Sequence, residues 1–199
     1  MPHDDQPAAS RRERQKARTR AAIQHQALRL FREQGYEATT IEQIAEAAEV
    51  APSTCFRYFP AKEDLVLTDD YDALIVEAFG AQPPGLGPVE AVRRALREVL
   101  GGLTEDELAD MGDRAELALA VPELRAATLD QLTQTIRQIT DLITRQTGRP
   151  DDDFPVRNLA GAILGVMISA EFYWAEHPGS NLVALLDDAL AHLESGLPL

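Results

Sequence analysis

The stretch that decides the fold is TTIEQIAEAAEVAPSTCFRYFPAKEDL, residues Thr39 to Leu65. It opens with a capping box, because the hydroxyl of Thr40 can accept a hydrogen bond from the Gln43 N–H while the Gln43 side chain reaches back. A second short helix is expected from Pro52, a first-turn position where the missing N–H of proline costs nothing. A tight turn near Glu49 separates the two helices, and Pro60 ends the second one.

Two short helices joined by a tight turn and preceded by a longer helix form a helix-turn-helix layout, in which the second short helix enters the major groove of DNA. On that second helix Cys55 and Phe59 are four residues apart and share one side, so they should pack on Ile44 and Phe31. The opposite side carries Ser53, Phe56 and Arg57, and the flank carries Thr54 and Tyr58.

The exposed side of this helix carries groups that suit DNA. Phe56 is an apolar group suited to a thymine methyl, and the Tyr58 hydroxyl can reach a phosphate oxygen. Lys62 lies at the next helix N-terminus, where a cation is unfavourable unless a bound phosphate offsets the cost. The alternative is that Phe56, Tyr58 and Phe59 all belong to the core of a small bundle. The expected DNA contacts are Arg18, Thr40, Pro52, Ser53, Thr54, Phe56, Arg57, Tyr58 and Lys62.

Charge is distributed unevenly along the chain. The net charge of the 199 residues is -14, yet residues 10–32 contain eight basic side chains and one acidic one, a balance of +7. Residues 68–199 contain nine basic and 23 acidic side chains, a balance of -14. Such asymmetry indicates two functions on one chain, with the basic end facing nucleic acid. The alternative is that the basic segment is a solvated start of a helix.

Hydrophobic periodicity predicts an all-α fold of about nine helices, because no segment alternates at period two. Residues 1–9 are expected to be a disordered tail, residues 10–67 a helix-turn-helix DNA-binding domain, and residues 68–199 a larger helical domain for ligand binding and dimerisation. One long helix is expected over residues 62–79. The stretch GAQPPGLGP, residues 80–88, is a clear break. Later helices are expected over residues 88–100, 104–120, 122–147, 155–177 and 181–195.

Residues 14–67 resemble the DNA-binding region of the tetracycline-repressor (TetR) family. The resemblance rests on Phe31, Gly35, Thr39, Thr40, Ile44, Ala45, Val50, Thr54, Tyr58, Phe59, Lys62 and Leu65, in the family's order and spacing. It implies a dimeric repressor, released from DNA by a small molecule in most members, with about nine helices. The rest of the chain resembles the family only in helix count, length and position.

Several positions depart from the family pattern. Glu49 occupies a turn position where glycine is usual, and Ala51 and Ala61 replace capping serines, each at a cost of about 1 kcal/mol. Phe56 stands where tyrosine is usual, so one backbone contact is lost. Cys55 replaces a larger apolar residue and is expected to be a small core residue. A redox switch at Cys55 is the alternative.

The C-terminal helices are expected to form a two-fold, four-helix interface. The helix over residues 155–177 is apolar on two faces, so one face can close the subunit and the other can meet a partner. Each subunit of the homodimer would then read one half of an inverted-repeat operator. The expected interface residues are Leu164, Ile168, Leu182, Leu186, Ala189 and Leu193.

In such regulators the effector cavity lies among the central helices. Candidate ligand-binding residues are Met111, Arg114, Met167, Glu171, Phe172 and Trp174. The alternative is that most of them are ordinary core or interface residues. A largely apolar or cationic effector is expected, with an anionic one depending on Arg114 or Arg125. If no effector exists, the protein would be a constitutive or architectural DNA-binding protein.

The sequence gives no support for an enzyme, a metal or a cofactor. The four histidines are scattered, no His/Cys group has zinc spacing, and no glycine-rich phosphate loop occurs. Asp151, Asp152 and Asp153 could suggest calcium, but a loop before a helix N-terminus attracts acids in any case. The single cysteine, the absence of a secretory signal and the absence of a bilayer-length apolar segment favour a cytoplasmic protein without a membrane segment.

Overall fold

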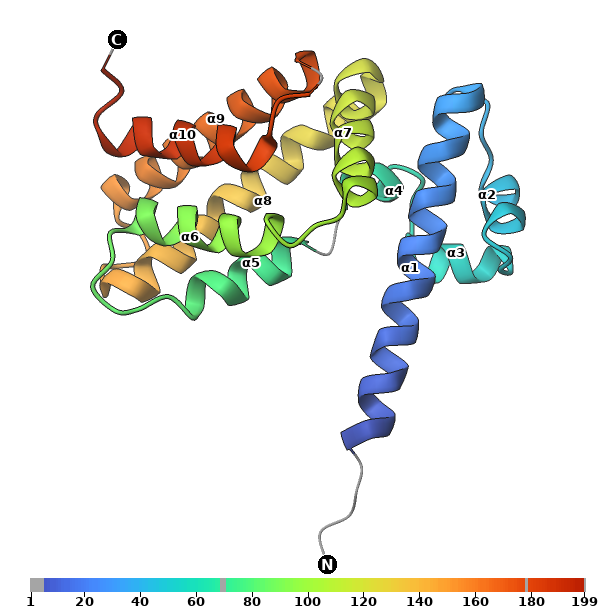
Figure 1. Cartoon of the computed structure of the whole chain (residues 1–199), viewed down its shortest axis with the longest axis horizontal. Coiled ribbons are helices and arrows are strands. Elements are labelled where there is room, and N and C mark those ends of the chain that lie inside the picture. Colours follow the sequence, from blue (N-terminus) through green and yellow to red (C-terminus); the bar gives the residue numbers. More distant parts are fainter. Residues whose placement is uncertain (1–5, 69–70, 178, 199) are drawn as a thin grey trace, which may run out of the picture. The chain divides into compact units, whose positions relative to one another are not determined.

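A computed structural model of the chain describes residues 6–68, 71–177 and 179–198. Within these residues every regular element is a helix, and ten helical segments follow one another along the chain (Figure 1). The predicted all-α class is therefore confirmed. The chain divides into two compact units, Met1–Thr68 and Asp69–Leu199.

The first unit contains α1 (Gln6–Gln34), α2 (Ile41–Ala47), α3 (Pro52–Tyr58) and α4 (Asp64–Leu67). Helix α1 packs on α2 and α4, and α2 packs on α3. Its core consists of Ile23, Ala27, Leu28, Phe31, Ile44, Cys55, Phe59 and Leu65. Helix α1 begins at Gln6, within the expected tail of residues 1–9, and residues 1–5 lie outside the described residues.

The turn between α2 and α3 has the expected chemistry. Thr40 Oγ1 accepts from the Gln43 N–H at 3.3 Å, and Gln43 Oε1 accepts from the Thr40 N–H at 2.8 Å. After α2 the backbone at Glu49 is left-handed, with φ of 55°. The Val50 N–H then donates to the Ala45 carbonyl at 2.9 Å, which satisfies one of the last carbonyls of α2. A glutamate in this conformation costs about 1 kcal/mol relative to glycine.

The single helix expected over residues 62–79 is wrong. Helix α4 ends at Leu67, Thr68 has an extended backbone, and α5 runs from Tyr71 to Gly80. The Gln24 side chain of α1 explains the break, since its Nε2 donates to the carbonyls of Leu65 at 3.0 Å and Thr68 at 2.7 Å. These bonds satisfy backbone groups that a continuous helix would have paired internally.

The second unit contains α5, α6 (Pro88–Leu100), α7 (Glu105–Ala120), α8 (Pro122–Thr147), α9 (Phe154–Glu176) and α10 (Leu182–Glu194). The starts follow from local sequence. Pro88 and Pro122 open α6 and α8, Thr104 forms a second capping box, and Asp153 and Asn181 cap α9 and α10 with side-chain oxygens. Gly148, with φ of 67°, ends α8.

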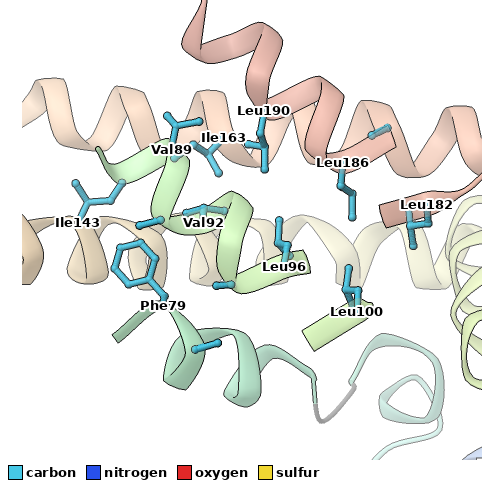
Figure 2. Packing of buried hydrophobic residues seen from close by; sticks show 14 of the residues in the cluster. Phe79, Val89, Val92, Leu96, Leu100, Ile143, Ile163, Leu182, Leu186 and Leu190 are labelled. Carbon is cyan, nitrogen blue, oxygen red and sulfur yellow. The ribbon is translucent and has the colours of Figure 1, made fainter. Parts of the chain in front are cut away.

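Helix α6 forms the centre of the second unit, where it packs on α5 and α10 (Figure 2). Helix α9 packs on α8 and α10 and completes the core. The labelled core residues are Phe79, Val89, Val92, Leu96, Leu100, Ile143, Ile163, Leu182, Leu186 and Leu190. At the edge, Arg93 of α6 donates two hydrogen bonds to Asp187 of α10, both at 3.1 Å.

Candidate nucleic-acid interface and effector cavity

Helix α3 separates its buried and exposed sides as the sequence indicates. Cys55 and Phe59 are buried, each at 1% exposure, and the residues on which they were expected to pack, Ile44 and Phe31, are buried as well. Ser53 and Arg57 are exposed, and Phe56 is 49% exposed although it is a large aromatic residue. The alternative in which Phe56 belongs to the core is therefore wrong, and α3 presents a polar and aromatic face away from its own core.

Four other residues expected to contact DNA differ in how far their side chains are exposed to solvent. Thr40 and Pro52 are exposed, whereas Thr54 and Tyr58 are half-buried on the flank. The Arg57 guanidinium lies over the Tyr58 ring, 5.3 Å from its centroid. This contact holds a cation and a hydroxyl-bearing ring close together at the C-terminal end of α3. Ala51 provides no side-chain cap for α3, as expected from the missing hydroxyl.

Lys62 is engaged inside the first unit in a way that the sequence did not reveal. Its ammonium Nζ donates to the Tyr36 carbonyl and lies 4.3 Å from the centroid of the Tyr36 ring. This contact stabilises the cation, so the unfavourable position near a helix N-terminus does not require a phosphate. Asp64 Oδ2 also accepts from the Ala61 N–H at 2.8 Å, which replaces part of the missing serine cap.

Arg20 of α1 also has a structural role that the sequence did not reveal, since its charge was counted there only as part of the basic residues 10–32. Its Nη1 donates to the Tyr58 carbonyl at 3.4 Å, and its guanidinium lies 4.6 Å from the Phe59 ring centroid. Both partners lie at the C-terminal end of α3, where a cation is favourable for the helix dipole. Arg20 therefore joins α1 to the end of the helix that carries Phe56 and Arg57.

Cys55 is a core residue in this arrangement. Its thiol lies on the buried side of α3, and burial raises the pKa of Cys55. The neutral thiol is therefore favoured over the reactive thiolate. The environment of Cys55 thus suits packing and gives no support to the redox alternative.

The second unit contains an apolar cavity of about 80 Å³ between α5, α6, α8 and α9. Most of its lining is aliphatic or aromatic, and its polar exceptions are Asp72, Thr135 and Gln138. The apolar lining consists of Ile75, Val76, Phe79, Val92, Leu96, Ile139, Leu142, Ile143 and Met167. Helix α5 and helix α8 therefore supply the largest parts of the wall.

Among the six residues proposed from sequence to bind a ligand, Met167 alone lines this cavity. Met111 and Trp174 pack at the edge of the core, where the Trp174 ring lies against Gly112 of α7. Arg114 and Glu171 are half-buried, and Phe172 is 41% exposed. The sequence-based candidates included no residue of α8, although this helix forms one wall of the cavity. Its apolar face could have been recognised from Ile139, Leu142 and Ile143, which have the i, i+3, i+4 spacing of one helix face.

The expected dimer-interface residues do not share one surface. Leu182 and Leu186 are 3% and 2% exposed and point from α10 toward α6 in Figure 2, and Leu164 is also buried. The core of the chain itself already covers these three side chains, so they leave little surface for another subunit. Ile168, Ala189 and Leu193 are half-buried and stay accessible in part.

An open groove lies on the other side of α9 and α10. It is lined by Val166, Ser169, Ala170, Tyr173, Leu185, Asp188, Ala189, His192 and Leu197. Next to it on α9, Gly161 and Gly165 leave open space, because a Cβ added at either would have no atom within 4 Å. This side of α9 and α10, called here the α9–α10 face, combines apolar side chains with small residues that let a helix approach closely.

Two further features of the described part of the chain concern what it could bind. No group of three or more His, Cys, Asp or Glu residues lies close enough there to hold a metal ion. Helix α9 has the length and mean hydropathy of a membrane-spanning helix, but a core helix of a water-soluble protein meets the same criteria. Only 22% of the most apolar 18-residue stretch of α9 is buried within the chain, so α9 leaves apolar surface for another contact.

Comparison with known proteins accounts for both units. Residues 23–68 match the model for bacterial regulatory proteins of the tetR family, and residues 86–198 match the MftR C-terminal domain. The HTH-type transcriptional regulator TcmR of Streptomyces glaucescens is 36% identical over 172 residues, which cover 81% of this chain and 76% of TcmR. The putative mycofactocin biosynthesis transcriptional regulator MftR of Mycobacterium tuberculosis is 27% identical and covers 99% of this chain and 98% of its own.

A solved structure agrees with these relatives. FadR of Thermus thermophilus, a TetR-family transcriptional repressor crystallised with lauroyl-CoA, has a TM-score of 0.56 and 26% sequence identity. The match covers 90% of this chain and 95% of FadR. With a matching model over more than half of its length and a relative above 30% identity, the chain belongs to the TetR family of transcriptional regulators.

Proposed function

We propose that the protein is a homodimeric repressor that binds an inverted-repeat operator and leaves it when a small molecule enters the second unit. The observation that carries the proposal is the face of α3, on which Ser53, Phe56 and Arg57 are exposed while Cys55 and Phe59 fix the helix to its core. A half-exposed aromatic residue beside an arginine leaves apolar area uncovered by its own core, and this pair suits the base edges and methyl groups of the major groove.

The main contacts in the proposed DNA interface divide between base edges and phosphates. Arg57 and Ser53 reach base edges, Phe56 meets a thymine methyl, and Tyr58 and Thr40 meet phosphates. The Thr40 hydroxyl accepts within its own cap, and its O–H remains able to donate outward. Lys62 has three N–H donors, so its bond to the Tyr36 carbonyl is compatible with a phosphate contact as well.

The proposed dimer uses the α9–α10 face of both subunits. Val166, Tyr173, Leu185 and Ala189 supply apolar area, and the open sites at Gly161 and Gly165 allow two α9 helices to approach closely. A two-fold axis through this face would pair the helices as a four-helix bundle. It would also place two copies of α3 for the two halves of an inverted repeat.

The proposed effector is a molecule with a long apolar part, such as an acyl chain. The lining of the cavity supports this class, and the 26% identical FadR was crystallised with lauroyl-CoA. A cavity of about 80 Å³ is smaller than a usual ligand site of roughly 300–1,000 Å³. Binding must therefore widen it, and the wall formed by α5 directly follows the DNA-binding unit in the chain. A hundredfold release requires about 2.7 kcal/mol of coupling between the two sites.

The alternative is a DNA-binding protein that has no effector. The small size of the cavity favours it, because a space that stays closed would belong to the core. Cytoplasmic localisation is part of both proposals, since each needs access to DNA.

One experiment with two stages tests the proposal. The full chain is first used to select operators from random double-stranded DNA. The enriched DNA is then used in a fluorescence-anisotropy screen of metabolites that includes acyl-CoA esters from four to eighteen carbons. Enrichment of an inverted repeat and release by longer chains support ligand-gated repression. Enrichment without any releasing compound leaves the constitutive alternative, and no enrichment contradicts DNA reading by α3.

A further inference from the structure

The first half of α1 projects beyond the packed part of its unit. Helix α1 begins at Gln6, and among its described side chains, which start at Arg11, the first buried one is that of Ile23. Residues 11–22 precede Ile23, which corresponds to about 18 Å of helix. Figure 1 shows this segment extending past α2 and α3. Tertiary packing does not explain why the helix continues so far.

The projecting segment is basic on several sides. Its basic residues are Arg11, Arg12, Arg14, Lys16 and Arg18, all of them exposed. Arg11, Arg14 and Arg18 share one side of the helix by their spacing, and Arg12 and Lys16 share another. A helix with charge on several sides has no apolar face to bury, so its surface suits a polyanion rather than a protein core.

The position of the segment relative to α3 follows from Arg20. This residue contacts the Tyr58 carbonyl and the Phe59 ring, so α1 passes the C-terminal end of α3 at that point. Residues 11–18 continue from there in the N-terminal direction. The projecting segment therefore continues from the C-terminal end of the helix that carries Phe56 and Arg57.

We propose that residues 11–18 of α1 bind the phosphates of DNA flanking each half-site and thereby extend the operator beyond the base pairs read by α3. This inference rests on the proposed DNA-binding function. Residues 11–18 span about 12 Å of helix, which could follow roughly three base pairs at 3.4 Å each. Phosphate contacts carry no sequence information, so the extension adds affinity and fixes orientation without adding base preference.

An anionic membrane is the other polyanion that a basic helix can bind. Helices that lie in membrane surfaces combine their basic side with large apolar residues on the opposite side. Residues 11–22 contain alanine but no large apolar side chain. The composition of the segment therefore favours DNA.

The test uses the full chain and its selected operator in two lengths, one trimmed to the two half-sites and one with ten extra base pairs on each side. The test variant is Arg11→Gln/Arg12→Gln/Arg14→Gln, because glutamine removes charge and keeps helix propensity. The matched control is Arg137→Gln/Arg145→Gln/Arg157→Gln, which removes the same charge from exposed positions of the second unit. Affinity is measured by anisotropy from 50 to 300 mM salt, and DNase footprints give the protected length.

The wild type and the control are expected to bind the long operator more tightly than the trimmed one. The test variant keeps Lys16 and Arg18, so it should lose most but not all of this difference. Its salt slope should fall by as much as about 5, since each phosphate contact contributes about 0.9 and a dimer loses six charges. Its footprint should shorten at both ends while its base preference stays the same. Equal slopes and footprints for the test variant and the wild type would overturn the inference. A wild type that selects no operator would instead overturn the proposed function, and this inference with it. Loss of binding to vesicles with 30% anionic lipid, with unchanged DNA binding, would assign the segment to a membrane.

Discussion

Arg20 of α1 donates a hydrogen bond to the main-chain carbonyl of Tyr58 at 3.4 Å, and the same guanidinium lies over the Phe59 ring. One arginine thus fixes the C-terminal end of α3 both through the backbone and through the core. Arg18, two residues earlier, is exposed. Two arginines on opposite sides of one helical turn therefore have different environments, and they should affect DNA binding in different ways.

Arg20→Gln is expected to lower operator affinity about tenfold or more without changing the salt slope, because it displaces α3 rather than removing a phosphate contact. Arg18→Gln should lower the slope by about 1 to 2 in the dimer, since each lost phosphate contact contributes about 0.9. Anisotropy titrations at several salt concentrations separate the two effects. A slope reduced by Arg20→Gln as much as by Arg18→Gln would show that Arg20 contacts DNA instead.

Gly165→Glu should convert the dimer to monomers. Its added side chain has open space within the subunit but would bury a charge in the proposed α9–α10 face, at a cost of several kcal/mol. The dimer dissociation constant should therefore rise by about two orders of magnitude or more. Gly80→Glu is the matched control, because that glycine of α5 also has nothing within 4 Å. Sedimentation velocity measures both variants, and a Gly165→Glu protein that stays a tight dimer would exclude this face.

Ile139→Trp should weaken the response to the effector while leaving operator affinity within about twofold. The larger side chain occupies space that the effector needs, and overpacking such a site costs about 1 to 3 kcal/mol. The effector concentration for half-maximal release should rise about tenfold, which corresponds to 1.4 kcal/mol. Leu129→Trp on the same helix is the control, since Leu129 is 67% exposed and does not line the cavity. An unchanged response in Ile139→Trp would place the effector elsewhere.

Asp187→Asn should destabilise the second unit in a pH-dependent way. The hydrogen bonds from Arg93 hold the pKa of Asp187 below its usual value near 3.9. A lowered pKa in the folded state contributes stability above the unfolded pKa, and this contribution disappears as the pH falls through the folded pKa. Urea unfolding at pH 7 should show a loss of about 1 to 3 kcal/mol that diminishes below about pH 4. A difference that stays constant from pH 7 to pH 3 would contradict this role of Asp187.

The DNA-binding unit was largely predictable because its signals are local. Thr40, Gln43 and Pro52 fix helix starts within a few residues, and the spacing of Cys55 and Phe59 orients α3. The break between α4 and α5 was not predictable in this way. It depends on Gln24, which is distant in sequence and reaches the carbonyls of Leu65 and Thr68.

The assignments in the second unit show the same limit. Helix α10 has apolar residues on more than one side, and its sequence does not say which side meets α6 and which meets another subunit. The structure buries Leu182 and Leu186 against the core and leaves Leu185 and Ala189 along the groove. Met167 was predicted correctly as a cavity residue, and it lies on the wall that α9 contributes. The residues of the α5 and α8 walls were not predicted, because which helices enclose the cavity depends on tertiary packing.

The central claim is that the exposed face of α3 reads DNA, and the base preference of Arg57→Ala tests it most directly. Random-sequence selection is performed with the wild type and with this variant, and both sets of enriched sequences are compared position by position. The account predicts that the wild type enriches an inverted repeat. It predicts that Arg57→Ala relaxes the preference at one or two symmetry-related positions, with a loss of about 1 to 3 kcal/mol there and little change elsewhere. Identical sequence preferences for the two proteins, or a uniform loss across all sequences, would contradict the claim.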